Sequence, residues 1–500
     1  MALIALIVNF LFAVTAIWVI FYLYTRYNHT YWKRLGIPSL RTHWFYGNLE
    51  DGILFRKSPS VVVGELHLEA PESDVLGIYI LQKPFLLVRN PELIKQILVK
   101  DFNVFPDRFF TAESRSDKIG SSNLFTIKNP EWRQLRTKIT PVFTSGKMKK
   151  LFYLIIETAD TMKNYLHDEF SDGTKTKTML MKDVTMKYTT NIISSVAFGV
   201  CVNSFDTNNN EFFRRAQKGL RQTFFGGLQL SIMFFFPYIS SFMGKKILGS
   251  ATDYLRKVFW DSMDNREITK TKRGDLIDSL IELKNNKQEN DYKLKGDVLV
   301  SQAAIFFIAG RESSVATMCF ALFELARNPG LQKRARNEIL QILETQELTY
   351  ESIQNMKYVN QVISEILRMY PPAPILDRVA TSNYKIPGTD MIIEKGTPIY
   401  VPLYGLHRDP KFYSTPDRFD PDRFSDENKG NIKQCTYMPF GEGPRICIGL
   451  RLGTMQSIMG VITVLKDYEV SLDPTFKYEI ERSNVFLTVP DGFRLNLTKL

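Results

Sequence analysis

Length, composition and charge are those of an ordinary globular protein. The 500 residues are 44% hydrophobic and 23% charged, and the four cysteines form no CxxC pair, which argues against a zinc site or a disulfide scaffold. The net charge of +11 suits acidic protein partners or anionic lipid, but a surplus of this size over 500 residues also occurs without a specific partner. No basic run interleaved with aromatic residues is present, so we expect no nucleic-acid partner.

The first predicted element is a membrane anchor at residues 1–25. Residues 2–25 carry no charge, and this stretch is longer than the ~20 residues with which a helix crosses a hydrocarbon core. It is also too long for the apolar part of a signal peptide, and it lacks a small-residue cleavage site. Arg26, Lys33 and Arg34 follow it, so the positive-inside rule predicts that the rest of the chain lies in the cytosol.

A second uncharged run covers residues 223–244. Glycines, Pro237 and polar residues interrupt it, which disfavours a second membrane crossing. Two interpretations stay open. The run forms either an irregular amphipathic surface that enters the membrane interface or an apolar hairpin inside the protein.

Most of the remaining chain is predicted to be helical, and the clearest helix runs from Val298 to about Arg327. Asp297 is a candidate N-cap, and Pro329 follows the end of the pattern. The first half is apolar on every side, so we expect the helix to cross the centre of the protein. Residues 310–314, GRESS, then place charged and hydroxyl side chains in it. Since an unpaired buried charge is costly, this segment either has a function or marks where the helix emerges into solvent.

Two further patterns precede the C-terminal region. Glu365 and Arg368 stand three residues apart and therefore share one helix face. Residues 383–402 alternate short β-prone runs with Pro-Gly and Lys-Gly turns, which predicts a small sheet. No Ser/Gly/Pro-rich linker divides the chain after the anchor, so we expect residues 26–500 to form a single domain.

The most distinctive motif is FGEGPRICIG at residues 440–449. Its three glycines, Gly441, Gly443 and Gly449, allow sharp turns and a close approach of the backbone to something flat. Ile446 and Ile448 place Cys447 among apolar side chains, because they lie on both sides of it. This setting favours a ligand thiolate over a nucleophile.

These motifs together resemble those of the cytochrome P450 family, and the chain is similar to its insect microsomal members. The resemblance rests on Phe440, Gly443, Arg445, Cys447 and Gly449 for the pattern Phe-x-x-Gly-x-Arg-x-Cys-x-Gly, on Glu365 and Arg368 with Arg423, and on Trp132 and Arg136 for Trp-x-x-x-Arg. It covers nearly the whole chain. It implies the cytochrome P450 fold, mainly α with a small β-rich part, preceded by one N-terminal transmembrane helix.

The resemblance also implies a cofactor and its binding residues. The cofactor is haem b (iron protoporphyrin IX), held by residues 26–500 as the catalytic domain, with Cys447 as the axial ligand of the iron. Haem carries two propionate carboxylates, and the guanidinium of arginine can donate hydrogen bonds to both oxygens of a carboxylate. The implied cofactor-binding residues are Trp132, Arg136, Arg378, Arg445, Phe440 and Gly441, with Arg108 as a further candidate. Glu365, Arg368 and Arg423 are implied to be structural.

The segment AGRESS resembles the oxygen-activation segment of the family, usually Ala-Gly-x-acid-Thr. Glu312 and Ser313 are therefore the candidate catalytic residues, an acid and a hydroxyl that deliver protons. Ser313 stands where threonine is usual, and Arg311 stands where an apolar residue is more common. Serine keeps the hydroxyl but lacks the methyl group that restricts its rotamers, so we expect an effect on coupling rather than on the type of reaction.

The predicted activity is that of a membrane-bound monooxygenase. It would insert one oxygen atom from O₂ into lipophilic small molecules, either xenobiotics such as insecticides or plant toxins, or endogenous hormones and lipids. The nearest match to the dinucleotide fingerprint GxGxxG is Gly441-x-Gly443, but Ile446 stands where the third glycine is needed. We therefore expect no nucleotide site of this type. Electrons are therefore expected from NADPH through NADPH-cytochrome P450 reductase, with cytochrome b5 as a further candidate partner.

The resemblance places the protein in the endoplasmic reticulum membrane, with the catalytic domain on the cytosolic face. Two other activities stay open at this point. One is a haem-thiolate isomerase or dehydratase that needs no O₂, and the other is a non-catalytic haem-binding protein. An acid at Glu312 and a hydroxyl at Ser313 favour the monooxygenase.

Overall fold

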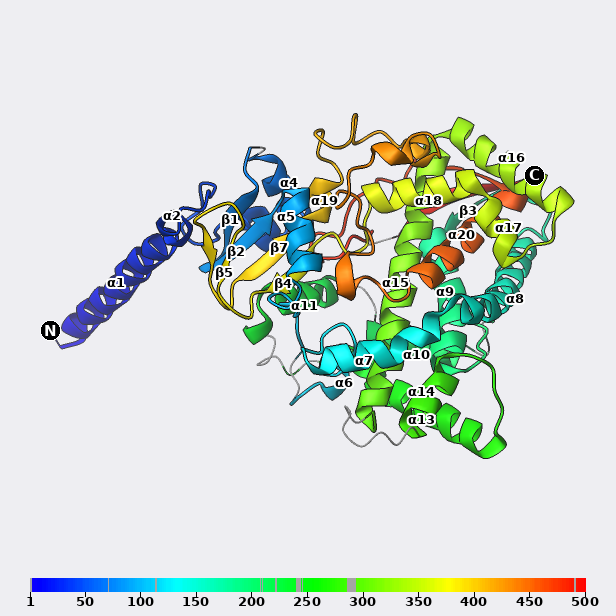
Figure 1. The fold of residues 1–500 in the computed structure, drawn as a ribbon, viewed down its shortest axis with the longest axis horizontal. Coiled ribbons are helices and arrows are strands. Elements are labelled where there is room, and N and C mark those ends of the chain that lie inside the picture. The colour runs from blue at the N-terminus through cyan, green and yellow to red at the C-terminus, as the bar shows by residue number, and fades with distance from the viewer. Residues whose placement is uncertain are drawn as a thin grey trace.

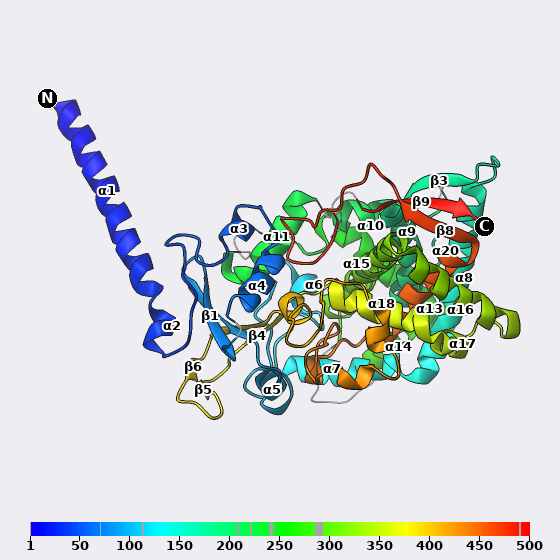
Figure 2. The same cartoon turned by 90° about the horizontal axis from the view of Figure 1, so that it is seen from above.

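The computed structural model describes residues 2–70, 72–112, 115–206, 208, 210–220, 223–239, 244, 246–285, 294–489 and 492–500. The described chain is mainly helical with small sheets, as the sequence predicts. Helix α1 (Ala2–Asn28) projects from the body as one straight rod, and the β-rich part lies between it and the helical part (Figures 1 and 2).

The helices after α1 make up most of the body. They are α2 (Tyr31–Arg34), α3 (Glu50–Ile53), α4 (Pro59–Leu68), α5 (Pro91–Lys95), η1 (Gln96–Lys100), α6 (Lys118–Ser121), α7 (Glu131–Ile139), η2 (Thr140–Phe143), α8 (Ser145–Glu169), α9 (Met181–Phe198), α10 (Glu211–Leu220), α11 (Phe224–Phe235), η3 (Gly249–Ala251), α13 (Thr252–Thr269), α14 (Leu276–Asn285), α15 (Asp297–Arg327), α16 (Pro329–Thr345), α17 (Tyr350–Asn355), α18 (Lys357–Met369), α19 (Leu403–Leu406), η4 (Pro421–Phe424), η5 (Lys429–Asn431), η6 (Gly443–Arg445) and α20 (Leu450–Asp467).

The strands of the described chain form three small sheets. The largest has the order β1 (Val75–Ile80), β2 (Lys83–Val88), β7 (Pro398–Val401), β4 (Leu376–Val379). The second pairs β5 (Tyr384–Lys385) with β6 (Ile392–Ile393), and the third has the order β3 (Thr176–Leu180), β9 (Arg494–Lys499), β8 (Tyr468–Leu472).

The sheet predicted at residues 383–402 is only partly right. β5 and β6 form a local hairpin there, but β7 joins the largest sheet, where it runs parallel to β2. The register pairs Leu86 with Ile399 and Leu87 with Tyr400. Pairing between such distant segments depends on the tertiary fold and leaves no local pattern.

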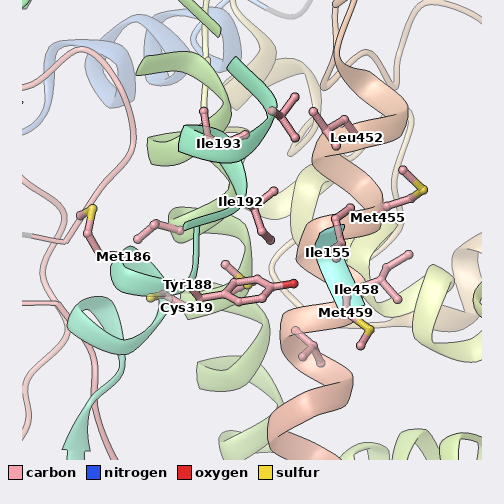
Figure 3. Close-up of a cluster of buried hydrophobic side chains, with 14 of the residues drawn as sticks. Ile155, Met186, Tyr188, Ile192, Ile193, Cys319, Leu452, Met455, Ile458 and Met459 are labelled. Atoms are coloured by element: carbon pink, nitrogen blue, oxygen red, sulfur yellow. The ribbon is translucent and has the colours of Figure 1, made fainter. Parts of the chain in front are cut away.

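Helix α15 crosses the centre of the body, as its apolar sequence predicts, and contacts α9 and α20. Figure 3 shows Ile192 and Ile193 of α9 opposite Leu452 and Met455 of α20. The helix begins at Asp297, so Gly296 rather than Asp297 is the N-cap residue.

The other interpretation of residues 310–314, a helix that emerges into solvent at position 311, is wrong. Arg311 is only 1% exposed and belongs to the largest fully buried side chains. Its charge therefore needs partners inside the protein.

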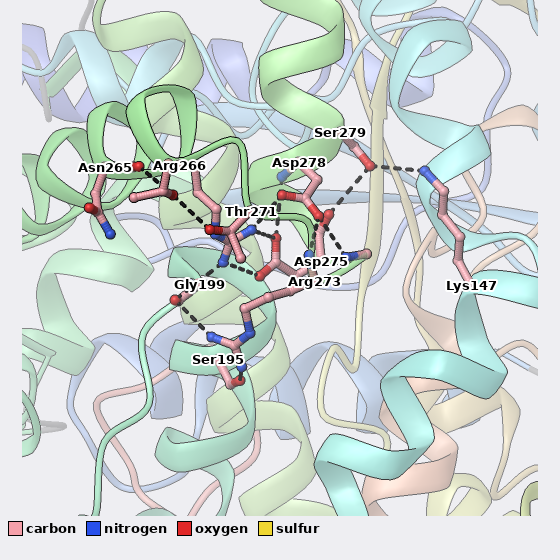
Figure 4. Close-up of polar contacts among 12 residues, drawn as sticks. Lys147, Ser195, Gly199, Asn265, Arg266, Thr271, Arg273, Asp275, Asp278 and Ser279 are labelled. Atoms are coloured by element: carbon pink, nitrogen blue, oxygen red, sulfur yellow. Dashed lines mark hydrogen bonds and ion pairs between the residues drawn. The ribbon is translucent and has the colours of Figure 1, made fainter.

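A buried ionic cluster joins the turn between α13 and α14 to the end of α9 (Figure 4). Arg266 donates to Asp275 at 2.8 and 3.0 Å and to Asp278 at 2.5 Å. Arg273 donates to the Gly199 carbonyl at 2.9 Å and to Ser195 Oγ at 2.8 Å. Since both guanidiniums have acceptors, the cluster holds α13 and α14 against the helix that packs on α15.

Two helices of the described chain are long and apolar enough to cross a membrane, α1 and α15. The most apolar window of α1 has no buried residue, whereas 56% of that of α15 is buried. α15 is therefore a core helix, and α1 fits the predicted anchor. The helix continues beyond residue 25 to Asn28.

Residues 223–244 match neither interpretation alone. Phe224 and Phe225 are 43% and 72% exposed at the start of α11, while Met233, Phe234 and Phe235 are buried. The end of the helix is thus part of the core, and its beginning faces outward. Residues 240–243 of this run lie outside the described residues.

Candidate haem site

A cavity of about 470 Å³ lies between α15 and the loop that carries Cys447. Ala309, Glu312 and Ser313 of α15 line one side, and Phe440 and Cys447 line the other. Aromatic and aliphatic side chains form much of the remaining surface; they include Phe110, Leu124, Phe125, Phe234, Ile305, Phe306 and Ile308. The cavity therefore joins a thiol, a cluster of cations and an apolar space.

The Cys447 loop owes its shape to two of its three glycines. Gly441 and Gly443 have φ of +78° and +74°, values that favour glycine. A Cβ at Gly443 would also overlap the Leu98 carbonyl. Gly449 lies in the turn before α20, as predicted, but its φ of −92° is open to any residue, so this turn does not require glycine.

Cys447 has an exposed side chain, and that surface faces the cavity. Its backbone N–H donates to the Phe440 carbonyl at 2.9 Å, which closes the loop. Because the cavity itself is enclosed by protein, desolvation raises the pKa of the thiol, while the Gly449 N–H and the Arg136 charge lower it. Since a metal ligand must be a thiolate, iron binding at Cys447 would release a proton.

Arginines gather on the cavity wall near this loop. Arg378 and Arg445 are 2% and 6% exposed, and burial with neighbouring guanidiniums lowers their pKa to about 9 and about 8. Arg108 donates to Asp377 at 2.8 Å, and Arg445 lies 3.4 Å from Asp107. The local charge is positive because Arg108, Arg378 and Arg445 outnumber these two acids.

One donor of this cluster is unsatisfied. Arg378 donates through Nη1 to the Asp377 carbonyl at 2.7 Å, but its buried Nε has no partner. A buried N–H without an acceptor is costly, so an anion at this wall would stabilise the site. Arg136 and Trp132 line the same wall, with the Arg445 guanidinium 4.3 Å above the Trp132 ring.

The charge of Arg311 is satisfied inside the protein. Its Nε donates to Thr190 Oγ1 at 3.0 Å, and its Nη1 donates to Glu312 Oε1 at 3.1 Å. Thr190 belongs to α9, so Arg311 connects Glu312 to that helix. Burial lowers the pKa of Arg311, and the Glu312 charge opposes this shift.

Ser313 turns its hydroxyl toward its own helix. Oγ donates to the Ala309 carbonyl at 2.6 Å while the residue lines the cavity. Glu312 and Ser313 thus both reach the cavity, on the side opposite Cys447. This is the juxtaposition that the segment AGRESS predicts.

Sequence reasoning missed Gln456, which binds α20 to the same turn of α15. Its Nε2 donates to the Gly310 carbonyl at 2.7 Å and also to Ser314 Oγ. The residue is fully buried, and its Oε1 has no partner. A weak signal exists in the sequence, since Gln456 is a long polar side chain between Met455 and the apolar residues that follow Ser457 in α20.

Glu365 and Arg368 form a buried pair in α18, and Arg368 donates to the carbonyl of His407, whose ring accepts from the Met438 N–H just before the Cys447 loop. Arg368 donates to both carboxylate oxygens at 2.7 and 2.8 Å, and both side chains are 0% exposed. Arg423 lies 3.4 Å from Glu365. The predicted triad is therefore present, and neither Glu365 nor Arg368 lines the cavity.

A cavity bounded by one thiol and a positive wall, inside a helical body with small sheets, is the arrangement of a haem-thiolate protein. The cytochrome P450 family profile matches residues 37–497. Cytochrome P450 6k1 of Blattella germanica is 40% identical over 96% of this chain and 94% of its own length. Probable cytochrome P450 6g2 of Drosophila melanogaster is 34% identical over 94% of this chain and 95% of its own.

Cytochrome P450 9e2 of Blattella germanica is 35% identical over 97% of both chains. The chain belongs to the cytochrome P450 family, whose members are haem-thiolate monooxygenases that bind haem b. The resemblance to the cytochrome P450 family that the sequence shows is confirmed, and so is the predicted fold.

The residues of the site fit haem b. The unpartnered Nε of Arg378 and the surplus of positive charge suit the two propionate carboxylates. Cys447 and Gly441 both line the cavity. The donor set thus offers one soft ligand for iron and several cations for carboxylates.

Proposed function

We propose that this cytochrome P450 inserts one oxygen atom from O₂ into lipophilic small molecules. We infer the substrate class from the cavity of about 470 Å³, because its walls beyond the arginine cluster are mainly aromatic and aliphatic and therefore favour lipophilic ligands. Xenobiotics such as insecticides or plant toxins and endogenous hormones or lipids share this chemistry.

The proposed domain organisation has an anchor at residues 1–25 and a single haem-binding catalytic domain at residues 26–500. The support is the absence of charge from residues 2–25 and the exposed surface of α1. Arg26, Lys33 and Arg34 favour a cytosolic body. We place the protein in the endoplasmic reticulum membrane on this basis.

Haem b, when bound, supplies the oxygen chemistry. Cys447 would hold its iron, with Phe440 and Gly441 against the porphyrin. The propionates would be bound by Trp132, Arg136, Arg378 and Arg445, with Arg108 beside them. Support for these roles comes from the cavity lining and from the surplus of buried positive charge.

Glu312 and Ser313 are the proposed catalytic residues. Ser313 Oγ is a donor and an acceptor at the cavity surface, so it can hold a water molecule or pass a proton there. Glu312 supplies the acid, and Arg311 fixes its carboxylate at 3.1 Å. The apolar walls exclude bulk water, which limits the protons that reach the site by other routes.

Electrons are proposed to come from NADPH through NADPH-cytochrome P450 reductase, with cytochrome b5 as an additional donor. The family generally uses a separate redox partner. The net charge of +11 suits an acidic partner, because opposite charge speeds association.

The test is turnover of a panel of lipophilic compounds by the full chain in lipid vesicles with reductase and NADPH. Under isotopically labelled O₂ we expect one labelled oxygen atom in each product. An unlabelled rearranged product would instead indicate the isomerase or dehydratase, and the absence of any product across the panel would indicate a non-catalytic haem protein.

The ligand assignment has its own test. Cys447→Ala should lose the thiolate-type carbon monoxide difference spectrum of the reduced protein. Cys201→Ala, at an exposed cysteine, is the matched control and should keep it. An unchanged spectrum in Cys447→Ala would exclude Cys447 as the ligand.

A further inference from the structure

Helix α1 is held against the body by side chains as well as by the chain that follows it. The Trp44 ring lies 6.3 Å from Trp18 and 5.6 Å from Tyr22, both nearly edge to face. Phe21 lies 6.3 Å from Trp44 and 6.1 Å from Phe45. One face of the anchor helix thus packs on the loop that precedes α3.

A second set of contacts holds the end of the same helix. Asn28 Nδ2 donates to the Gln82 carbonyl at 3.0 Å, and His29 Nε2 hydrogen-bonds to the Leu81 carbonyl at 3.0 Å. Gln82 Nε2 in turn donates to the Phe45 carbonyl at 3.2 Å. We call Trp44, Phe45, Leu81 and Gln82 the anchor clamp.

The chain after α1 is packed as well. Trp32 is 0% exposed, and its Nε1 donates to the Ile78 carbonyl at 3.0 Å. Its backbone N–H donates to Tyr79 Oη at 3.0 Å, and a Cβ at Gly77 would overlap its ring. A free hinge needs an exposed, weakly bonded segment, whereas these contacts fix the chain at Trp32, directly after α1, to strand β1.

The length of α1 fixes the depth of the anchor clamp in a bilayer. α1 has 27 residues, and ~20 of them cross the hydrocarbon. With the N-terminal end at the far interface, Trp18 and Tyr22 fall near the cytosolic boundary, just before Arg26. Tryptophan and tyrosine concentrate at that level. Trp44 must lie at the same depth, because it contacts both rings.

We propose that Trp44 and Phe45 form a second contact with the bilayer, at the headgroup level, and that the anchor clamp joins α1 to the catalytic domain as one rigid unit. This inference rests on the proposed membrane association. The turn that carries Gln82 also places Lys83 4.6 Å above the exposed Tyr238 ring. The same rigid surface therefore extends to the segment after α11.

The first test measures rigidity. Spin labels are introduced as encoded amino acids at Ile7 and Leu68, which are 51% and 41% exposed, in full-length protein bound to phosphatidylcholine vesicles. We expect one narrow distance distribution in the wild type and in Trp44→Phe, which keeps an aromatic ring. The pair Trp44→Ser with Phe45→Ser should broaden it several-fold.

The second test measures depth. The vesicles contain lipids brominated either close to the headgroup or near the end of the acyl chain. The Trp44 signal is the tryptophan emission of the wild type minus that of Trp44→Phe. We expect stronger quenching of that signal by the bromine close to the headgroup. A Trp44 signal that neither lipid quenches would overturn the bilayer contact.

Flotation of the vesicles separates the two levels of the proposal. Protein that does not float would contradict the proposed membrane association and with it this inference. Protein that floats but shows a wild-type distance distribution as broad as that of the double serine variant would overturn the rigid clamp alone. Tyr153→Ser, at an exposed ring on α8, is the surface control and should change neither readout.

Discussion

The two sides of the cavity are built in different ways. On the Cys447 side, backbone conformation and a buried ion pair set the geometry, through positive φ at Gly441 and Gly443 and through Glu365 with Arg368. On the α15 side, side chains from α9 and α20 set it. The difference shows which parts of a site leave a fixed spacing in the sequence and which depend on the tertiary fold.

The largest expected effect breaks the Cys447 side. Arg368→Ala removes the guanidinium that binds both Glu365 oxygens, so a carboxylate stays buried with Arg423 at 3.4 Å and the Asp420 N–H at 3.0 Å as its remaining partners. Loss of one partner of a buried pair costs about 3–5 kcal/mol in free energy of unfolding. Urea unfolding and haem content measure the loss.

The matched control is Arg334→Ala, at an ion pair with Asp422 that is about half exposed on both partners. Such a surface pair contributes under about 1 kcal/mol. Equal losses in Arg334→Ala and Arg368→Ala would show that the triad does not hold the Cys447 side together.

A smaller effect on the same side depends on pH. His407 is fully buried, its Nδ1 donates to the Arg368 carbonyl at 3.1 Å, and its Nε2 accepts from the Met438 N–H at 3.2 Å. Burial lowers the pKa of His407 from 6.5 to about 3. Between these values the unfolded chain binds a proton that the folded chain does not. Stability is therefore fully present above pH 6.5 and decreases as the pH falls below it.

At pH 5 this loss amounts to about 2 kcal/mol, since one pH unit corresponds to about 1.4 kcal/mol. His407→Gln cannot be protonated, so it lacks this loss. Between pH 7.5 and pH 5, the free energy of unfolding of the wild type should therefore fall by about 2 kcal/mol more than that of the variant. Urea unfolding across this range is the measurement. A difference that stays constant with pH would exclude the buried neutral histidine.

The sequence predicted the Cys447 side better than the α15 side for a physical reason. A loop that needs positive φ needs glycine at fixed positions, and an Arg368 that binds Glu365 needs it one helical turn away. These are local rules. Gly449 shows the limit of this rule, because it lies in a turn whose φ of −92° does not require glycine.

On the α15 side the sequence predicted the residues but not their partners. Glu312 and Ser313 reach the cavity as expected, yet nothing local indicates that Arg311 binds Thr190 or that Gln456 binds Gly310. Those contacts join helices that are far apart in the chain. The pairing of β7 with β2 was missed for the same reason.

Gln456 allows a test of whether α20 supports the α15 side. Gln456→Leu leaves the Gly310 carbonyl and Ser314 Oγ without this donor, which should cost about 1–2 kcal/mol in free energy of unfolding. Gln456→Glu has nearly the same shape but no amide donor at neutral pH. We expect it to be at least as destabilised, because its charge would be buried.

Thermal unfolding of the haem-loaded variants measures this effect. Gln332→Leu is a control for loss of a buried glutamine elsewhere, since its Nε2 donates to the Leu325 and Val470 carbonyls away from the cavity. Only the position 456 variants should also change the spin-state response to a bound substrate. A variant at 456 that matches wild type in both readouts would contradict the proposed support.

The smallest expected effect concerns Ser313. If its hydroxyl passes a proton at the cavity surface, Ser313→Ala should lower product per NADPH a few-fold and raise hydrogen peroxide, while NADPH consumption continues. Glu312→Gln should instead lower both product formation and NADPH consumption, because proton supply itself slows. NADPH, peroxide and product are measured together after haem content is checked.

Two variants sharpen this last comparison. Ser313→Thr restores the branched side chain, whose stiffer χ1 should hold the hydroxyl in one rotamer and raise product per NADPH. Ser457→Ala is the control, because that hydroxyl also lines the cavity and donates to a carbonyl four residues back, at 2.8 Å, but from α20. Uncoupling in Ser457→Ala equal to that in Ser313→Ala would mean that any hydroxyl lost from the wall lets water disturb the reaction. Wild-type coupling in Ser313→Ala would mean that Ser313 Oγ only caps the Ala309 carbonyl, and that the α15 side contributes shape rather than proton transfer.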